Sequence, residues 1–173
     1  DTIFAACDTA DKGADFTSMP IVAIYDQEAY LIDVVFDDAP PTVTKPECAK
    51  CLIDNKVGDA LFESNNAGMY FARDVAELVK NAGFNTSIRT KRTISNKQTR
   101  IEFASDGIKK HFYFKHPSTY KRGCQYWGFM QEVTTYVRSG KVAHDDAPDS
   151  LSLLENEIRN RISGKIEIFK RPF

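Results

Sequence analysis

The chain has 173 residues, which is enough for one domain with its own hydrophobic core, and its 42% hydrophobic and 27% charged residues are typical of a soluble globular protein. No apolar run approaches the roughly 18 residues of a membrane span, and no signal-peptide pattern opens the chain. Because it starts at Asp1 without a methionine and enters an apolar segment at once, we expect residues 1–173 to be a single domain cut from a longer protein.

The N-terminal part of the sequence predicts three β-strands. Apolar and β-branched residues fill positions 3–7, 20–25 and 29–36, and the first run ends at Asp8. The link at 26–28 is short enough for a hairpin. These segments predict an antiparallel meander.

The middle of the sequence predicts alternating helices and strands. Residues 37–45, with Pro40 and Pro41, predict a loop, and a helix is expected to start at Thr44 or Lys45 before Pro46 and to run to about residue 55. A strand at 59–62 leads to Glu63. Residues 65–81 have apolar side chains at helical spacing, and a fifth strand follows at 86–90.

The C-terminal part predicts further mixed structure. We expect a short basic helix at 96–105, a turn at 106–107, a strand at 108–114 and a helix at 126–137. A last helix starts between 145 and 149, and residues 165–169 predict a terminal strand or extended tail. This order of elements predicts an α/β fold with a mixed central sheet flanked by helices.

Acidic residues are concentrated where these elements begin or end. His144, Asp145, Asp146 and Asp149 lie within six positions directly before the last helix, and an unpaired carboxylate cluster normally persists only on a solvated surface or around a cation. Asp8 and Glu63 each follow a predicted strand. If those two strands are parallel neighbours, the two acids emerge side by side, and the last helix can add a third. We expect a site for hard divalent cations here.

The chemistry that suits such a site is phosphodiester hydrolysis. Two Mg²⁺ or Mn²⁺ ions about 3.5–4 Å apart can activate a water and neutralise the leaving oxygen. We expect Asp8 to bridge the ions, and Glu63 and Asp146 to complete the ligands. Asp145 and Asp149 are adjacent candidates that the sequence does not rank. His144 is a candidate catalytic residue that could deprotonate a water, contact the phosphate or bind metal, or it could be a polar loop residue.

Each acid also has an ordinary structural interpretation. Asp8 could cap a turn, Glu63 could be an N-terminal helix acid favoured by the helix dipole, and Asp145 to Asp149 could be helix caps. The acids that follow Asp8 are not spaced as in an EF-hand, so a calcium loop of that kind is excluded.

The net charge of −1 hides a strongly basic middle segment. Residues 86–122 hold ten Lys or Arg and two acids, a net charge of +8, so the rest of the chain carries −9. Lys97 and Arg100, one helical turn apart, are candidate phosphate-binding residues, together with Lys91 and Arg92. The alternative is a solvated basic surface.

The four cysteines are too few and too scattered for a secreted disulfide scaffold, so we expect reduced thiols. Cys48 and Cys51 have the spacing of zinc ligands or of a redox pair, but no second Cys or His pair lies near them. A zinc or redox protein is therefore an alternative without a complete ligand set.

Taken in order, these motifs resemble a known family. The segments 8–15 (Asp-Thr-Ala-Asp-Lys-Gly-Ala-Asp), 62–68 (Phe-Glu-Ser-Asn-Asn-Ala-Gly) and 144–151 (His-Asp-Asp-Ala-Pro-Asp-Ser-Leu) resemble the acidic motifs of the C-terminal nuclease domain of tailed-phage terminase large subunits. The segment 97–101 (Lys-Gln-Thr-Arg-Ile) is similar to the basic segment that this family has between its second and third acidic motifs. Ser150 departs from the alanine that many members have before the leucine.

The resemblance implies an RNase H-like fold, related to Holliday-junction resolvases and integrases. It implies a Mg²⁺- or Mn²⁺-dependent endonuclease that cuts double-stranded phage DNA concatemers during genome packaging. The family's first acid falls on Asp8, its second on Glu63 and its third on the pair Asp145 and Asp146, with Asp149 as an accessory.

The resemblance also implies partners and a location. The partners are a packaging ATPase domain in the same polypeptide, the small terminase subunit and the portal. The location is the bacterial host cytoplasm. The chain itself has no G-x-x-x-x-G-K-[ST] phosphate-binding loop, so we expect no ATP hydrolysis from it.

Two further functions fit the same residues. A resolvase or transposase-type nuclease would keep the fold and change the DNA substrate. A non-catalytic DNA-binding or docking module would bind DNA in a salt-sensitive way and would not need a metal.

Overall fold

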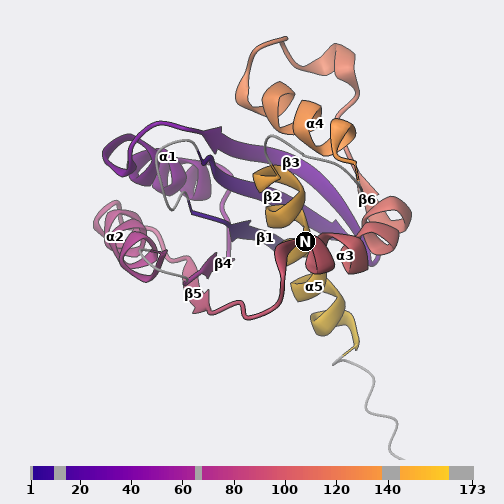
Figure 1. The fold of residues 1–173 in the computed structure, drawn as a ribbon. Helices are drawn as coiled ribbons and strands as arrows, with labels where there is room; N and C mark the ends of the chain where they lie inside the picture. The colour runs from indigo at the N-terminus through magenta and orange to yellow at the C-terminus, as the bar shows by residue number, and fades with distance from the viewer. Residues whose placement is uncertain (1, 10–14, 65–67, 138–144, 164–173) are drawn as a thin grey trace, which may run out of the picture.

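The fold of this chain comes from a computed structural model that describes residues 2–9, 15–64, 68–137 and 145–163 (Figure 1). No helix in these ranges is both long enough and apolar enough to pass through a membrane. The elements, in chain order, are β1 (Thr2–Cys7), β2 (Thr17–Tyr25), β3 (Glu28–Asp37), α1 (Pro41–Asp54), β4 (Asp59–Glu63), α2 (Gly68–Asn81), β5 (Ser87–Lys91), α3 (Lys97–His111), β6 (Phe112–Tyr113), the short 3₁₀ helix η1 (Pro117–Thr119), α4 (Gln125–Thr135) and α5 (Asp146–Ser163).

A mixed sheet of six strands in the order β5-β4-β1-β2-β3-β6 forms the centre of the molecule. The strands β1, β2 and β3 are antiparallel neighbours, which confirms the predicted meander. Asp26 and Gln27 both have positive φ, of 47° and 66°, and so form the tight turn between β2 and β3. The strands β4 and β5 run parallel to β1, and β6 runs parallel to β3.

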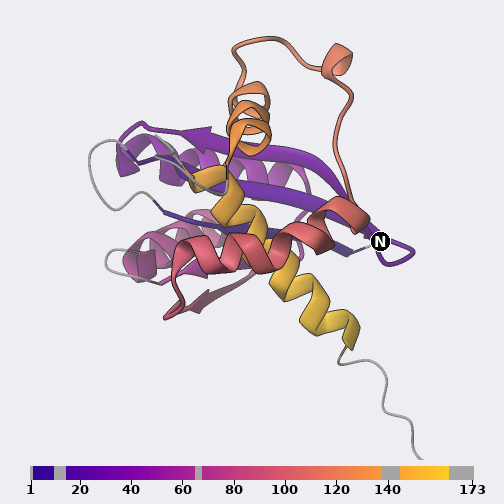
Figure 2. The same ribbon diagram turned by 45° about the vertical axis from the view of Figure 1, so that its right-hand side comes forward.

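Helices cover both faces of this sheet, because the strands present apolar side chains to both sides. One core, with Leu52 and Val75, lies under α1 and α2. The other, with Phe129 and Leu154, lies under α4 and α5. Figure 2 shows α3 and α5 crossing each other on this second face, and they have extensive contacts.

Two predicted boundaries in the sequence were wrong. The helix expected from Thr44 or Lys45 begins at Pro41, inside the expected loop, because proline's fixed φ suits the first position of a helix. Pro46 lies inside that helix. The helix expected at 96–105 continues as α3 to His111, through the expected turn at 106–107, and only Phe112 and Tyr113 remain of the strand expected at 108–114.

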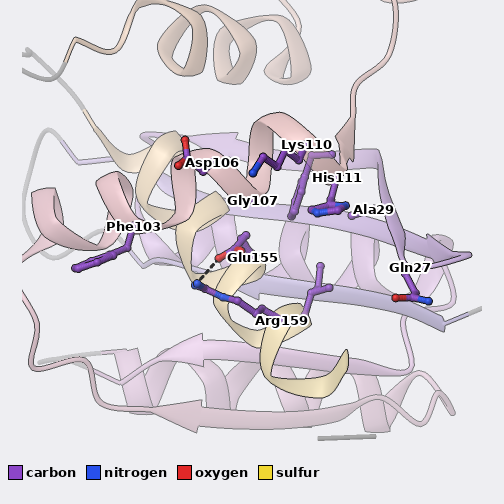
Figure 3. Close-up of a pocket in the computed structure, with 11 residues that line it drawn as sticks. Gln27, Ala29, Phe103, Asp106, Gly107, Lys110, His111, Glu155 and Arg159 are labelled. Atoms are coloured by element: carbon purple, nitrogen blue, oxygen red, sulfur yellow. Dashed lines mark hydrogen bonds and ion pairs between the residues drawn. The ribbon is translucent and has the colours of Figure 1, made fainter. Parts of the chain in front are cut away.

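Packing against α5 explains why α3 continues. Ile101 and Ala104 are buried on the side of α3 that faces the core. Gly107 lies against Glu155 of α5, so that a Cβ at this position would be 2.2 Å from Oε1 of Glu155. Figure 3 shows this region, where Glu155 is paired with Arg159 at 2.8 Å beside a cavity of about 350 Å³. The expected terminal strand at 165–169 lies outside the described residues.

A glutamine attaches α4 to the end of β3. The side-chain oxygen of Gln125 accepts a hydrogen bond of 2.7 Å from the backbone N–H of Phe36. Its amide nitrogen donates to Glu47 at 2.5 Å and to Asp37 at 3.4 Å. The start of α4 is therefore held at the same edge of the sheet where β1 and β4 end.

We predict that Gln125→Ala lowers the free energy of unfolding by about 1–3 kcal/mol, because the N–H of Phe36 loses its acceptor. Gln131→Ala, on the exposed side of the same helix, is the matched control and should change it by less than about 0.5 kcal/mol. Urea unfolding of the two variants measures both values. Equal effects would show that this side chain does not anchor α4.

Candidate metal centre

The ends of β1 and β4 bring two of the predicted acids together. These strands are parallel neighbours in which Cys7 pairs with Phe62, so the next residues, Asp8 and Glu63, lie side by side. On one side Glu63 pairs with Lys91 of β5, and on the other Asp8 forms a bridge with Ser18 at the start of β2. The sheet therefore places both carboxylates in one row of residues at its edge.

The start of α5 adds a third carboxylate. Carboxylate oxygens of Asp8, Glu63 and Asp149 all lie within 4.8 Å of one another. Asp149 is 1% exposed and Glu63 is 6% exposed, so the group is largely shielded from water. The hydroxyls of Ser18 and Ser150 are 2.8 Å apart in the core and connect α5 to β2 beside these acids. We call Asp8, Glu63 and Asp149 the carboxylate cluster.

The other two predicted acids of this segment lie beside the carboxylate cluster. Asp146, expected to complete the ligand set, accepts hydrogen bonds from the backbone N–H of Phe16 at 3.1 Å and from Lys97 at 3.0 Å. Asp145 is half-buried and lies 2.9 Å from the ammonium nitrogen of Lys97. The geometry therefore brings Asp149, rather than Asp146, closest to the two strand-end acids.

Two cations of α3 lie among these acids. The Nζ of Lys97 is 2.9–3.7 Å from oxygens of four acids, Asp8, Asp145, Asp146 and Asp149. Arg100 makes a two-pronged contact with Asp149, at 2.5 and 3.1 Å, and its guanidinium is 3.7 Å from Glu63. Two of the four residues predicted to bind phosphates thus pair with acids of the site in this structure and offset part of their charge.

Burial and mutual repulsion change how these groups ionise. Burial raises the pKa of Asp8 well above its ordinary value, and the charges of Asp149 and Glu63 raise it further, although Lys97 opposes this. Burial also raises the pKa of Asp149 against the opposing hydrogen bond from Arg100. Burial alone would lower the pKa of Lys97, but the surrounding carboxylates raise it, so the ammonium stays charged.

The carboxylate cluster fits a hard divalent cation. Its donors are all carboxylate oxygens, which Mg²⁺ and Mn²⁺ prefer, and each acid has an oxygen within 4.8 Å of those of the other two. Lys97 already places a positive charge among them, as a bound ion would. An open pocket of about 260 Å³ gives access to the cluster and is lined by Asp8, Thr9, Glu63, Thr93, Ser95, Lys97, Arg100 and Asp149.

The first residue of α2 is a glycine that packs against the backbone of Glu63. Gly68 is buried, and a Cβ at this position would lie 2.0 Å from the backbone oxygen of Glu63 and 3.1 Å from the hydroxyl of Thr9. Only glycine fits so close an approach to the backbone. The glycine of the segment 62–68 therefore has a packing role next to the carboxylate cluster.

The remaining predicted residues lie in three different settings. Lys91 and Arg92 are exposed at the end of β5, next to Glu63. His144 lies outside the described residues. Cys48 is buried in α1, and Cys51 is half-buried with its thiol 3.5 Å from Asp33. Burial and the nearby Asp33 raise the pKa of the Cys51 thiol.

Sequence reasoning missed that Lys97 and Arg100 contact the acids. It also did not rank Asp149 first, although a signal was present: Asp149 lies one helical turn after Asp146. The side chain of Asp149, at the fourth position of α5, can face the strand ends, while Asp146 at the first position accepts a hydrogen bond from the backbone of Phe16. That choice depends on how α5 is rotated against the sheet.

No protein-family model matches this chain, and no curated protein matches it in sequence. Its fold is nevertheless similar to that of several solved nucleases. The human cytomegalovirus terminase nuclease domain, Mn-soaked and with an inhibitor bound, has a TM-score of 0.64 at 11% identity, covering 97% of this chain and 87% of that one. The nuclease domain of the large terminase subunit of bacterial virus Sf6 has a TM-score of 0.61 at 11% identity, covering 90% and 88%.

The fowlpox virus Holliday junction resolvase is also similar, with a TM-score of 0.57 at 12% identity, covering 92% of this chain and 99% of the resolvase. Identities this low establish the fold alone. The chain therefore has an α/β fold of the RNase H-like class. The similarity in fold to viral terminase nuclease domains agrees with the family resemblance of the sequence motifs.

We predict that Gly68→Ala lowers the free energy of unfolding by about 1–3 kcal/mol and displaces Glu63, because the new Cβ overlaps the backbone oxygen of that residue. Gly58→Ala, which meets no atom within 4 Å, is the control and should be neutral or slightly stabilising. Thermal and urea unfolding compare them. A fully stable Gly68→Ala would contradict the close approach.

We also predict that Lys97→Ala lowers the free energy of unfolding in EDTA by about 2 kcal/mol, because four acids lose a shared counter-charge. This figure is reduced because one third of the Lys97 side chain is exposed and solvent screens its charge. Mn²⁺ should raise the melting temperature of this variant more than that of the wild type, since an ion can take the place of the ammonium. Lys80→Ala, on exposed α2 surface, should show neither effect. A Mn²⁺ response equal to that of the wild type would argue against a cation site at Lys97.

Proposed function

We propose that this chain is a metal-dependent endonuclease that cleaves double-stranded DNA. The observation that carries the proposal is the convergence of Asp8, Glu63 and Asp149, from β1, β4 and α5, within 4.8 Å at an open pocket. A structural role would not require buried like charges from three elements to meet, because their mutual repulsion destabilises the fold.

The carboxylate cluster would hold Mg²⁺ or Mn²⁺, and we expect two ions, with Asp146 and Asp145 available as further ligands. Bound ions of this kind make a water nucleophilic and neutralise charge at the phosphate. Lys97 and Arg100 balance the acids, hold their orientation and can shift when cations bind. Lys91 and Arg92, exposed beside Glu63, would bind phosphates of the DNA.

The finer assignment is the nuclease of a terminase large subunit that cuts phage DNA concatemers during genome packaging. Its support is the order of the acidic motifs in the sequence and the similarity in fold to two viral terminase nuclease domains. In that role the chain would be one domain of a longer protein with a packaging ATPase. It would work with the small terminase subunit and the portal in the bacterial host cytoplasm.

A Holliday-junction resolvase is the second candidate function. The observation that favours it is the extent of the structural match with the fowlpox virus resolvase. The match covers 92% of this chain and 99% of the resolvase, so neither has a large segment that the other lacks. A comparison of four-way junctions with linear duplexes of the same sequence separates the two functions. Symmetric cuts in the junction alone would favour the resolvase.

We predict that Asp8→Asn and Glu63→Gln each reduce Mn²⁺-dependent cleavage of plasmid DNA at least about 100-fold, because a lost ligand removes several kcal/mol of charge stabilisation. Asp149→Asn should reduce it more than Asp146→Asn, since only Asp149 belongs to the carboxylate cluster. Calorimetric titration with Mn²⁺ should show the same ranking for binding.

The matched control is Glu77→Gln on exposed α2, which should cut normally. EDTA should abolish cleavage by the wild type. DNA binding that is salt-sensitive, metal-independent and never followed by cutting would instead favour a non-catalytic DNA-binding module.

A further inference from the structure

The row of residues at the edge of the sheet extends beyond the carboxylate cluster on both sides. Strand pairing sets Lys91, Glu63, Asp8, Ser18 and Phe36 side by side in that order across β5, β4, β1, β2 and β3. Four spacings of about 4.8 Å make this row about 19 Å long. The acids lie in its middle, and Lys91 lies at one end.

The opposite end of the row carries a second pair of cations. Phe36 at that end is hydrogen-bonded to Gln125, the first residue of α4. Lys121 and Arg122 lie four and three residues before Gln125, so the Cα of Arg122 is at most about 11 Å from that of Gln125. The helices α4 and α5 cover the same face of the sheet (Figure 1), so the segment that enters α4 lies on the face from which α5 contributes Asp149.

The local structure presents this pair to solvent. Lys121 and Arg122 are both exposed. A turn that contains Gly123 at φ 84°, closed by a hydrogen bond of 3.3 Å from Cys124 N–H to the carbonyl of Lys121, fixes the backbone. The guanidinium of Arg122 lies 5.8 Å from the ring centre of Trp127, which limits its freedom.

The charges at the two ends of the row are available to a ligand. Within the described part of the chain, Lys91, Arg92, Lys121 and Arg122 form no ion pair with a carboxylate, in contrast to Lys97 and Arg100. Asp37, the acid at the end of β3, already accepts hydrogen bonds from Ala39 at 2.7 Å and from Gln125.

We propose that Lys121 and Arg122 form a phosphate-binding group that holds duplex DNA across the carboxylate cluster, opposite Lys91 and Arg92. A ligand that fits must carry negative groups about 19 Å apart and a phosphodiester between them. One strand of a duplex has a phosphate for every 3.4 Å of rise, so about five or six phosphates span the row. Duplex DNA meets this requirement because its phosphates recur at a regular spacing, whereas an acidic protein segment has no phosphodiester to place at the cluster. The proposal rests on the proposed function only for the position of the scissile phosphate.

The test is DNA binding measured without cleavage. Fluorescence anisotropy with a duplex of about 30 base pairs compares the wild-type chain with Lys121→Gln/Arg122→Gln over a series of salt concentrations. Ca²⁺ at a fixed concentration replaces Mg²⁺ or Mn²⁺, so that a cation lies between acids and phosphates, and a gel confirms that the duplex stays intact. We expect affinity to fall about tenfold, and the slope of log K against log salt to become shallower by up to about 1.8, at about 0.9 per lost phosphate contact. Asp38→Asn, which removes an exposed acid at the same corner, should strengthen binding.

The control with the same change in net charge is Lys56→Gln/Lys80→Gln, on exposed positions of the sheet face covered by α1 and α2. It should leave the slope unchanged. Arg122→Lys should keep the slope, which separates lost charge from lost packing on Trp127. An equal fall in DNA affinity in the control would overturn the proposal, and so would an unchanged slope in Lys121→Gln/Arg122→Gln. Binding of an acidic peptide in place of DNA would also overturn it.

These outcomes are distinct from those that test the nuclease. If Asp8→Asn and Glu63→Gln cut like the wild type, the proposed function fails while the salt slopes still report the phosphate-binding group. If those variants lose cutting but Lys121→Gln/Arg122→Gln binds DNA normally, the nuclease proposal stands and this inference fails.

Discussion

Electrostatic repulsion between buried carboxylates is the constraint around which this edge of the molecule is organised. Parallel pairing of β1 and β4 places Asp8 next to Glu63, and α5 adds Asp149, so three like charges share a space of a few ångströms. Such a group is tolerable only with compensating positive charge. In this structure α3 supplies that charge through Lys97 and Arg100.

The need for this counter-charge explains features that lie far from the acids. The helix α3 must lie across α5 so that its first turn reaches the strand ends, and its length to His111 follows from continued packing on α5. Gly107 permits the close approach to Glu155, and Gly68 permits α2 to start against the backbone of Glu63. Both glycines therefore belong to the same arrangement as the charged residues.

The arrangement also separates two kinds of cation. Those within the site are engaged with acids and adjust its charge, whereas those at the ends of the row, at Lys91 and Arg92 and at Lys121 and Arg122, are exposed to solvent. A polyanion attracted by the outer cations would meet the inner acids only with divalent ions between them, which avoids repulsion between phosphate and carboxylate. This is why metal binding and DNA binding are expected to depend on each other in the proposed function.

Local patterns in the sequence determined much of this protein. Alternating and β-branched residues determined β1 to β5, helical spacing determined α2 and α5, and the position of acids directly after apolar strands identified Asp8 and Glu63. These features depend on neighbouring residues, so a single sequence contains them. Only the tertiary structure decided that α3 continues to His111, that Asp149 rather than Asp146 joins Asp8 and Glu63, and that Lys97 and Arg100 pair with the acids. Each of these depends on how α3 and α5 are rotated and packed over the sheet, which is set by contacts between residues far apart in sequence, such as Lys97 with Asp146 and Arg100 with Asp149, both 49 positions apart.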